Sequence, residues 1–169
     1  MDGKDSNEPK KSMPLLCWDI CAMNSLEVKA KNKKDTELKI LSDFHHEYDW
    51  DLRLTKILES AYEGLVLTDK EIKIQWVNSG FTEMTGFSQK EVIGKSPKML
   101  QGANTSEEAR RRIRQQLYGN KPFTESLVNY RKNGEEYICK VEIYPVFNSE
   151  SELSHFLALE SEEKEDKAE

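Results

Sequence analysis

The chain has 169 residues, of which 33% are charged, and a formal net charge of −6 at neutral pH. This length fits one domain with additional flanking segments. The acidic balance excludes a general nucleic-acid or anionic-membrane binder, because both partners require a basic surface. No apolar run reaches the roughly 18 residues of a membrane span. The polar N-terminus and the odd count of 3 cysteines favour the reducing environment of the cytoplasm.

The N-terminal third is expected to precede the main domain as an extension. Residues 1–12 are polar and are predicted to be disordered, whereas residues 13–57 are predicted to be largely helical. Cys17 and Cys21 are four residues apart in an apolar stretch and have no second pair of ligands beside them. We therefore expect two helical cysteines that face a core, and no metal site.

The second half of this extension carries a thin apolar stripe. Leu38, Leu41 and His45 recur at helical spacing within a strongly charged stretch. A helix with so little apolar surface needs a partner, either the main domain or a second chain. Trp18 and Trp50 are predicted to anchor the helices of the extension.

The rest of the chain is predicted to be one α+β domain at residues 58–162, with a charged tail at 163–169. GLVLTD and EIKIQWVN read as two strands of a hairpin. Alternation in the second strand places Ile72, Ile74 and Trp76 on one side and Lys73, Gln75 and Val77 on the other. SGFTEMTG and SQKEVIG are short helical segments that end at glycines, and TSEE fits a capping box before a longer helix.

The C-terminal part of this domain has the pattern of antiparallel strands. Asn133-Gly134 is a strong hairpin signal between two of them. In the second of these strands Cys139, Val141 and Ile143 share a face. In the last strand, alternation puts Phe156, Ala158 and Glu160 on one face and Leu157 and Leu159 on the other. The predicted fold is a five-stranded antiparallel sheet with short helices on one face.

Several short motifs, in this order and spacing, resemble those of the PAS family of sensor domains. The motifs are Trp76-Val77-Asn78, Phe81, Met84-Thr85-Gly86-Phe87-Ser88, Glu91-Val92-Ile93-Gly94-Lys95, Leu100-Gln101-Gly102, Asn129-Tyr130-Arg131-Lys132-Asn133-Gly134 and Pro145-Val146. The resemblance implies the PAS fold and a role in signal transduction through a ligand-binding pocket.

Within that family the chain resembles most the LOV branch, which senses blue light with a flavin. Residues 94–102 read GKSPKMLQG, where LOV domains have a phrase of the form GRNCRFLQG. The photoreactive cysteine of that branch falls on Pro97, which has no thiol. The resemblance therefore implies a LOV-like domain that cannot form the covalent flavin–cysteine adduct at this position.

The same resemblance assigns further residues to the pocket. Gln101, Asn129 and Arg114 match flavin contacts of the LOV branch, the last of them a contact to the flavin phosphate. Lys98, Cys139 and Glu160 occupy positions where that branch has an arginine, an asparagine and a glutamine. Lysine keeps the charge of arginine but loses its planar bidentate fork. Asn78 is assigned to the same predicted pocket.

Three features of these residues permit both a structural and a functional interpretation. Cys139 is expected to be a small core residue, since its face is apolar, although a displaced nucleophile is the alternative. Glu160 is either an exposed residue near a strand end or a buried carboxylate that contacts Asn129 or a ligand. The arginine-rich run at 110–114 is either a solvated helix face or a contact for phosphate or an acidic partner.

No catalytic constellation, nucleotide loop or metal-ligand spacing is visible in the sequence. We therefore expect a stand-alone PAS domain for sensing or protein interaction, not an enzyme. Its ligand is left open, with FMN as a candidate. The expected partners are a signalling protein and a second copy, through the N-terminal helices or the sheet face. The alternatives are a cysteine-less LOV-like protein that photoreduces FMN or FAD without an adduct, and a ligand-free dimerisation module.

Overall fold

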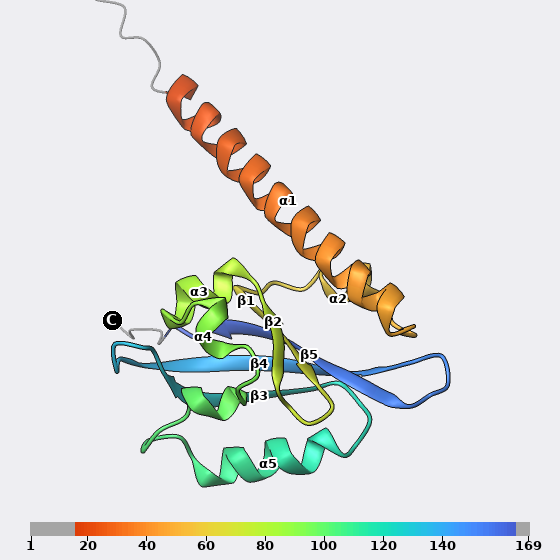
Figure 1. Ribbon diagram of the computed structural model, residues 1–169. Coiled ribbons are helices and arrows are strands. Elements are labelled where there is room, and N and C mark those ends of the chain that lie inside the picture. Colours follow the sequence, from red (N-terminus) through yellow and green to blue (C-terminus); the bar gives the residue numbers. More distant parts are fainter. Residues whose placement is uncertain (1–15, 165–169) are drawn as a thin grey trace, which may run out of the picture. The chain divides into compact units, whose positions relative to one another are not determined.

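The computed structural model describes residues 16–164, and the side chains of its first helix from residue 25 onward. The chain divides into two compact units, Met1–Thr36 and Glu37–Glu169. In chain order (Figure 1) the elements are α1 (Leu16–Glu47), α2 (Leu54–Ile57), β1 (Gly64–Asp69), β2 (Ile74–Val77), α3 (Ser79–Thr85), α4 (Gln89–Val92), the 3-10 helix η1 (Pro97–Leu100), α5 (Glu107–Leu117), β3 (Phe123–Tyr130), β4 (Glu136–Phe147) and β5 (Leu153–Glu162).

The five strands form one antiparallel sheet in the order β2-β1-β5-β4-β3. The last strand of the chain, β5, therefore lies in the centre of the sheet between β1 and β4. The predicted α+β class, the five antiparallel strands and the preceding helix are confirmed. So is the alternation in β5, because Leu157 and Leu159 pack in one apolar cluster and Ala158 contacts the clusters of the opposite face.

The predicted alternation in β2 is wrong, because the strand begins late and contains an irregularity. Ile74 and Val77 pack in the same apolar cluster, while Trp76 packs in another. The register with β1 shifts between Leu67 and Thr68, which reverses the side-chain parity as a β-bulge does. Ile72 lies in the turn before the strand with φ +62°, a strained conformation for a β-branched residue.

Local caps fix the short helices on the inner face of the sheet. The Asn78 side chain caps α3, which ends at Gly86 in the left-handed conformation, and Ser88 and Glu91 form a capping box on α4. At α5 the predicted capping box does not form, because Ser106, one residue later than Thr105, is the N-cap. The Thr105 hydroxyl instead donates to the Val128 carbonyl at 2.6 Å, which ties the start of α5 to β3.

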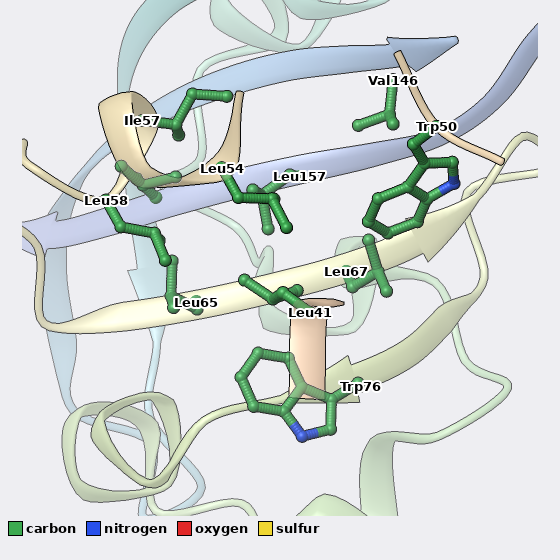
Figure 2. Packing of buried hydrophobic residues seen from close by; sticks show 11 residues of the cluster. Leu41, Trp50, Leu54, Ile57, Leu58, Leu65, Leu67, Trp76, Val146 and Leu157 are labelled. Carbon is green, nitrogen blue, oxygen red and sulfur yellow. The ribbon is translucent and has the colours of Figure 1, made fainter. Parts of the chain in front are cut away.

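The outer face of the sheet is covered by residues of the second unit that precede the first strand, between Glu37 and Glu63. Figure 2 shows the apolar cluster formed there by Leu41, Trp50, Leu54, Ile57, Leu58, Leu65, Leu67, Trp76, Val146, Leu157 and Leu159. The apolar stripe near the end of α1 thus has its partner within the second unit, where Leu41 is fully buried. Trp50 is an anchor as predicted, and its ring stacks on that of Phe44.

A buried polar cluster holds the same part of α1. Glu37 is 4% exposed; its carboxylate accepts hydrogen bonds from Asn78 Nδ2 at 2.7 Å and from the Tyr62 hydroxyl at 2.8 Å. The Asn78 Oδ1 in turn accepts from the backbone amides of Leu65 and Phe81, both at 2.8 Å. Both groups donate to Glu37, and its two oxygens accept both hydrogen bonds. A carboxamide has one acceptor oxygen, so it could hold the Tyr62 hydroxyl only by donating to it.

In the first unit the structure describes α1 from Leu16 to Thr36 as regular helix. Leu26 and Val28 are exposed within it. The side chains of Cys17, Trp18 and Cys21 lie outside the described residues, as do the predicted disordered segment 1–12 and the end of the charged tail. Among the described helices none is long and apolar enough to cross a membrane.

The Glu37 cluster predicts a specific loss of stability. Glu37→Gln replaces two acceptor oxygens by one and makes the Tyr62 hydroxyl accept where it now donates, so it should lower the free energy of unfolding by about 1 kcal/mol. Urea denaturation measures this change. Glu83→Gln, at an exposed position of α3, is the matched control and should stay within about 0.5 kcal/mol of the parent protein. Equal stability of the two variants would contradict the role given to Glu37.

Candidate functional site

The inner face of the sheet and the helices over it enclose a cavity of about 420 Å³, within the usual size range of small-molecule pockets. Most of its wall is apolar, and polar groups enter it at a few points. The lining residues are Val66, Thr68, Ile72, Ser96, Pro97, Lys98, Leu100, Gln101, Glu107, Arg110, Ile113, Arg114, Leu117, Leu127, Asn129, Cys139, Val141, Ile143, Phe156, Ala158 and Glu160.

All but one of the residues assigned to the pocket by resemblance line this cavity. Lys98, Gln101 and Arg114 come from η1, its C-terminal flank and α5, and Asn129, Cys139 and Glu160 come from β3, β4 and β5. Asn78 does not line it, and its assignment to the pocket is corrected. Its amide caps α3 and binds Glu37 and the Glu63 carbonyl, so both its oxygen and its nitrogen are occupied outside the cavity.

The sheet side of the cavity contains buried polar atoms that the protein leaves unsatisfied. Within the described part of the chain, Asn129 Oδ1, Glu160 Oε2 and Thr68 Oγ1 are buried and have no hydrogen-bond partner. Such atoms are rare in folded proteins, because each costs about 1–3 kcal/mol when it is left unpaired. Three of them on one wall point to a ligand that donates and accepts hydrogen bonds at its edge.

Of these three groups, Glu160 loses the most free energy on burial, because it is a carboxyl group that would otherwise be charged. It lies on the central strand β5, opposite Val141 of β4 and Gly64 of β1, and is 5% exposed. Burial raises the pKa of its carboxyl from 4.5 to about 7, because the charged form loses its hydration. The alternative of a solvent-exposed glutamate near a strand end is thereby excluded.

Cys139 lies on the same face and is fully buried. Burial, and after it the charge of Glu160, raises the pKa of its thiol. A thiol in this environment is a poor nucleophile, because the thiolate is the reactive form. The apolar neighbours Leu127 and Val141 pack beside it, as expected of a small core residue.

Pro97 stands at the first position of η1, which Ser96 caps through a hydrogen bond from the Lys98 amide. Proline suits this position, because its missing N–H would have no partner in the first turn. Its ring lines the cavity but offers neither thiol nor hydrogen-bond donor. The wall at this point is therefore chemically inert.

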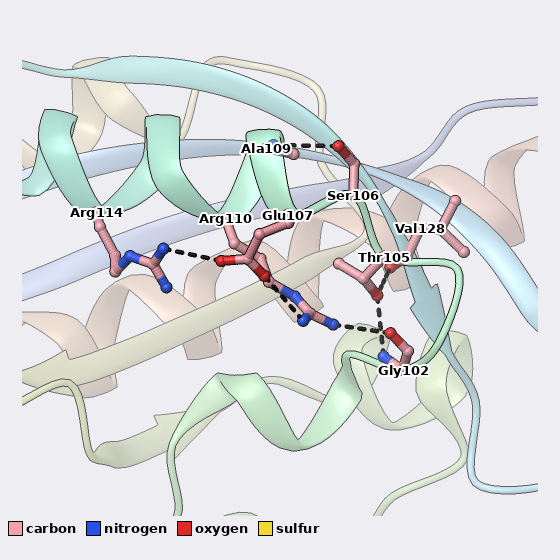
Figure 3. Close-up of polar contacts among 8 residues, drawn as sticks. All are labelled: Gly102, Thr105, Ser106, Glu107, Ala109, Arg110, Arg114 and Val128. Carbon is pink, nitrogen blue, oxygen red and sulfur yellow. Dashed lines mark hydrogen bonds and ion pairs between the residues drawn. The ribbon is translucent and has the colours of Figure 1, made fainter.

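Positive charge gathers at the mouth of the cavity, where Lys98, Arg110 and Arg114 line it. The sequence resemblance did not assign Arg110 or Glu107 to this pocket. Figure 3 shows Glu107 between Arg110 and Arg114 on α5. Glu107 Oε2 is 3.3 Å from Arg110 Nη1, and its Oε1 is 3.0 Å from Arg114 Nη2. The sequence contained the signal for this cluster, because residues spaced by three and seven positions share one face of a helix.

Of the other arginines on α5, Arg112 forms a paired contact with a carboxylate away from the cavity. Its Nε and Nη2 atoms donate to the two oxygens of Glu125 at 2.7 and 2.9 Å. These hydrogen bonds, and after them the charge of Arg112, lower the pKa of Glu125. The arginine-rich run therefore divides, with Arg110 and Arg114 lining the cavity and Arg112 holding α5 to β3.

The loop between η1 and α5 depends on a glycine. A Cβ added at Gly102 would lie 2.4 Å from the Tyr130 ring, so no larger residue fits there without a shift of the ring. The Tyr130 hydroxyl accepts a hydrogen bond from the Asn104 amide, and the Gly102 carbonyl accepts one from Arg110 Nη2 at 2.7 Å. These contacts fix the cavity edge on which Gln101 stands.

Residues 63–160 match the family described as the PAS domain. The chain belongs to the PAS domain family. A nitrogen fixation regulatory protein of Klebsiella oxytoca is 31% identical over 104 residues, which are 62% of this chain and 21% of that protein. A blue-light photoreceptor of Listeria innocua is 31% identical over 112 residues, which are 64% of this chain and 44% of that protein. The chain thus spans between a fifth and a half of these relatives.

Solved structures of LOV domains resemble this PAS domain in fold. The dark structure of the blue-light photoreceptor Aureochrome1 LOV has a TM-score of 0.64 and 26% identity, covering 69% of this chain and 86% of that one. A LOV structure with a flavin analogue has a TM-score of 0.62 and 29% identity, covering 69% and 88%. The matched region is therefore a LOV-like PAS sensory domain of the kind found in signalling proteins.

Burial of Glu160 predicts a characteristic pH dependence of stability. Because its folded-state pKa lies above the ordinary value of 4.5, the folded state loses stability as the pH rises from about 4.5 to about 7. Below this window both states are protonated and the effect vanishes. Above it, the cost amounts to about 3 kcal/mol.

We expect Glu160→Gln to remove this cost. The difference in free energy of unfolding between the variant and the parent protein should grow in favour of the variant from pH 5 to pH 8. Urea denaturation at several pH values measures it, and the comparison cancels the contributions of other carboxylates. A difference that does not change with pH would show that Glu160 does not titrate in this window.

Proposed function

We propose that this chain is a sensory PAS domain that binds a flavin in its cavity without a covalent bond and signals through a protein partner. The observation that carries the proposal is the wall of unsatisfied polar atoms beside an otherwise apolar cavity. A flavin ring has two apolar faces and an edge with both donors and acceptors, which such a wall would satisfy. When bound, it supplies reversible reduction, driven by light or by a redox partner.

The residues of the cavity fit this group. Asn129 Oδ1 and Glu160 Oε2 are available for the polar edge of the ring, and Gln101 lines the cavity from the flank of η1. Val66, Leu100 and other apolar residues would cover its faces. Arg114, Arg110 and Lys98 would hold an anionic side chain at the mouth. With Pro97 in place of a thiol, the flavin would be held by these contacts alone.

The ligand-free dimerisation module is the less favourable alternative. Such a module would fill the inner face of its sheet with bulky side chains, since unfilled volume costs stability. Here the side chains leave about 420 Å³, and Asn129, Thr68 and Glu160 add the cost of unpaired polar atoms. In a module that only packs and dimerises, nothing would offset the stability lost to the unfilled volume and the unpaired buried atoms.

The proposed output runs from the cavity to α1 through directly bonded groups. The Glu160 carbonyl accepts from the Glu63 amide at 2.8 Å, and the Glu63 carbonyl accepts from Asn78 Nδ2 at 3.2 Å. Asn78 then binds Glu37 of α1. A ligand that changes the hydrogen bonding of Glu160 would bias this connection, and with it the packing of the segment that covers the outer face.

The domain is flanked by a helical extension, and it acts on other proteins. We propose a division into a helical extension at 13–57 and a PAS domain at 58–162, acting in the cytoplasm without catalytic output of its own. A signalling protein would read the state of α1 or of the outer sheet face. A second copy of the chain could use the same surfaces. The relatives named above support the signalling role, since one is a regulatory protein and one a photoreceptor.

The test is binding of FMN or riboflavin, followed by flavin fluorescence and by the absorbance of the isolated protein. Asn129→Ala removes an unsatisfied acceptor of the cavity wall and should weaken flavin binding about tenfold. Asn133→Ala, at an exposed turn position, is the matched control and should leave binding unchanged. A colourless protein that also fails to bind added flavin would overturn the proposal.

A further inference from the structure

The charged groups at the mouth of the cavity differ in their burial and in their partners. The Arg110 side chain is 29% exposed and that of Arg114 is 51% exposed. Arg110 Nη2 is fixed on the Gly102 carbonyl at 2.7 Å. Its Nε is buried and has no acceptor in the described part of the chain. Arg110 is therefore the more buried of the two arginines, held in place by the loop, with its Nε–H free to bind a ligand.

Glu107 is the carboxylate that both arginines share. It lines the cavity itself, and its side chain is 70% exposed. The hydrogen bond from Arg114, then that from Arg110, and last the charges of both arginines lower the pKa of Glu107, so it is ionised throughout the neutral range. Exposed ion pairs of this kind are weak, because water and salt screen them. Glu107 therefore occupies the position that an anionic group would take beside the two arginines, and its ion pairs with them are weak enough to be displaced.

We propose that Glu107 is a built-in competitor for the anionic group of the ligand, and that its contest for Arg110 sets the preference between phosphorylated and unphosphorylated flavin. This inference rests on the proposed function. A ligand phosphate that approaches Arg110 and Arg114 must displace a carboxylate that already neutralises part of their charge. The domain thus discriminates in favour of FMN over riboflavin less strongly than its arginines alone would.

The neighbouring residues of α5 provide a matched control. Glu108 is also a glutamate of the first turn, but it pairs with Arg112 at 3.0 Å and does not line the cavity. Glu107→Gln and Glu108→Gln remove the same charge from adjacent positions. A general change in the charge of the domain would affect both variants equally, whereas competition at the cavity mouth affects only the first.

The experiment compares the dissociation constants of FMN and riboflavin, measured by fluorescence titration of flavin-free protein. Glu107→Gln should raise the preference for FMN by about two- to fivefold at low salt, and high salt should reduce this gain. Glu108→Gln should not change the preference. Arg110→Gln should lower it about tenfold, while Arg110→Lys should retain part of it. An identical preference in the two glutamine variants would overturn the inference.

A second measurement separates this inference from the proposed function. Inorganic phosphate should raise the melting temperature of Glu107→Gln more than that of Glu108→Gln, because the freed arginines bind it. If neither flavin binds, the proposed function fails, and the phosphate measurement still decides the role of Glu107. Equal stabilisation of the two variants by phosphate would overturn that role.

Discussion

The side chain of Asn78 is the contact on which the arrangement of this domain depends. Its oxygen accepts from the amides of Leu65 and Phe81, and its nitrogen donates to Glu37 and to the Glu63 carbonyl. One amide thereby joins the start of β1, the first turn of α3 and the C-terminal half of α1. Because it is 3% exposed, each of these bonds lies in a low-dielectric environment, where an unpaired group is costly.

The position of this amide also connects the two faces of the sheet. On the outer side it holds Glu37, beside the cluster that contains Leu41 and Trp76. On the inner side, Glu63 links it to Glu160, because the Glu63 carbonyl accepts from Asn78 and the Glu63 amide donates to the Glu160 carbonyl. The N-terminal extension is therefore joined to the cavity by a few bonded groups. A sensor needs this coupling, since a ligand acts only through groups whose energy differs between its two states.

The cavity, in contrast to the Asn78 contacts, lowers the stability of the folded domain. Its unpaired oxygens and the raised pKa of Glu160 reduce stability, and Ile72 adds a strained backbone on its wall. Functional sites commonly retain such costs, because groups poised for a ligand are unsatisfied without it. At the mouth of the cavity, Arg110 and Arg114 share the Glu107 carboxylate, which a ligand anion can displace.

The sequence determined the parts of the fold that rest on local periodicity and capping. The faces of β5, the helix stop at Gly86 and the Asn133-Gly134 hairpin depend on neighbours in the chain, so their patterns were readable. The resemblance in short motifs also assigned Asn129, Cys139 and Glu160 to one pocket. The irregular register of β2 was not readable, because a bulge leaves no alternation to follow.

Only the tertiary structure decided which polar residues are buried and what they face. Glu37 lies in a strongly charged stretch, where no pattern singled it out, yet Asn78 and Tyr62 bind it from distant segments. Asn78 resembled a pocket residue and proved to be a cap, while the arginine run, which the sequence left open between a solvated face and a phosphate or partner contact, places Arg110 on the cavity wall. Burial arises from segments far apart in the sequence, and it decides whether a charge is solvated or must find a partner.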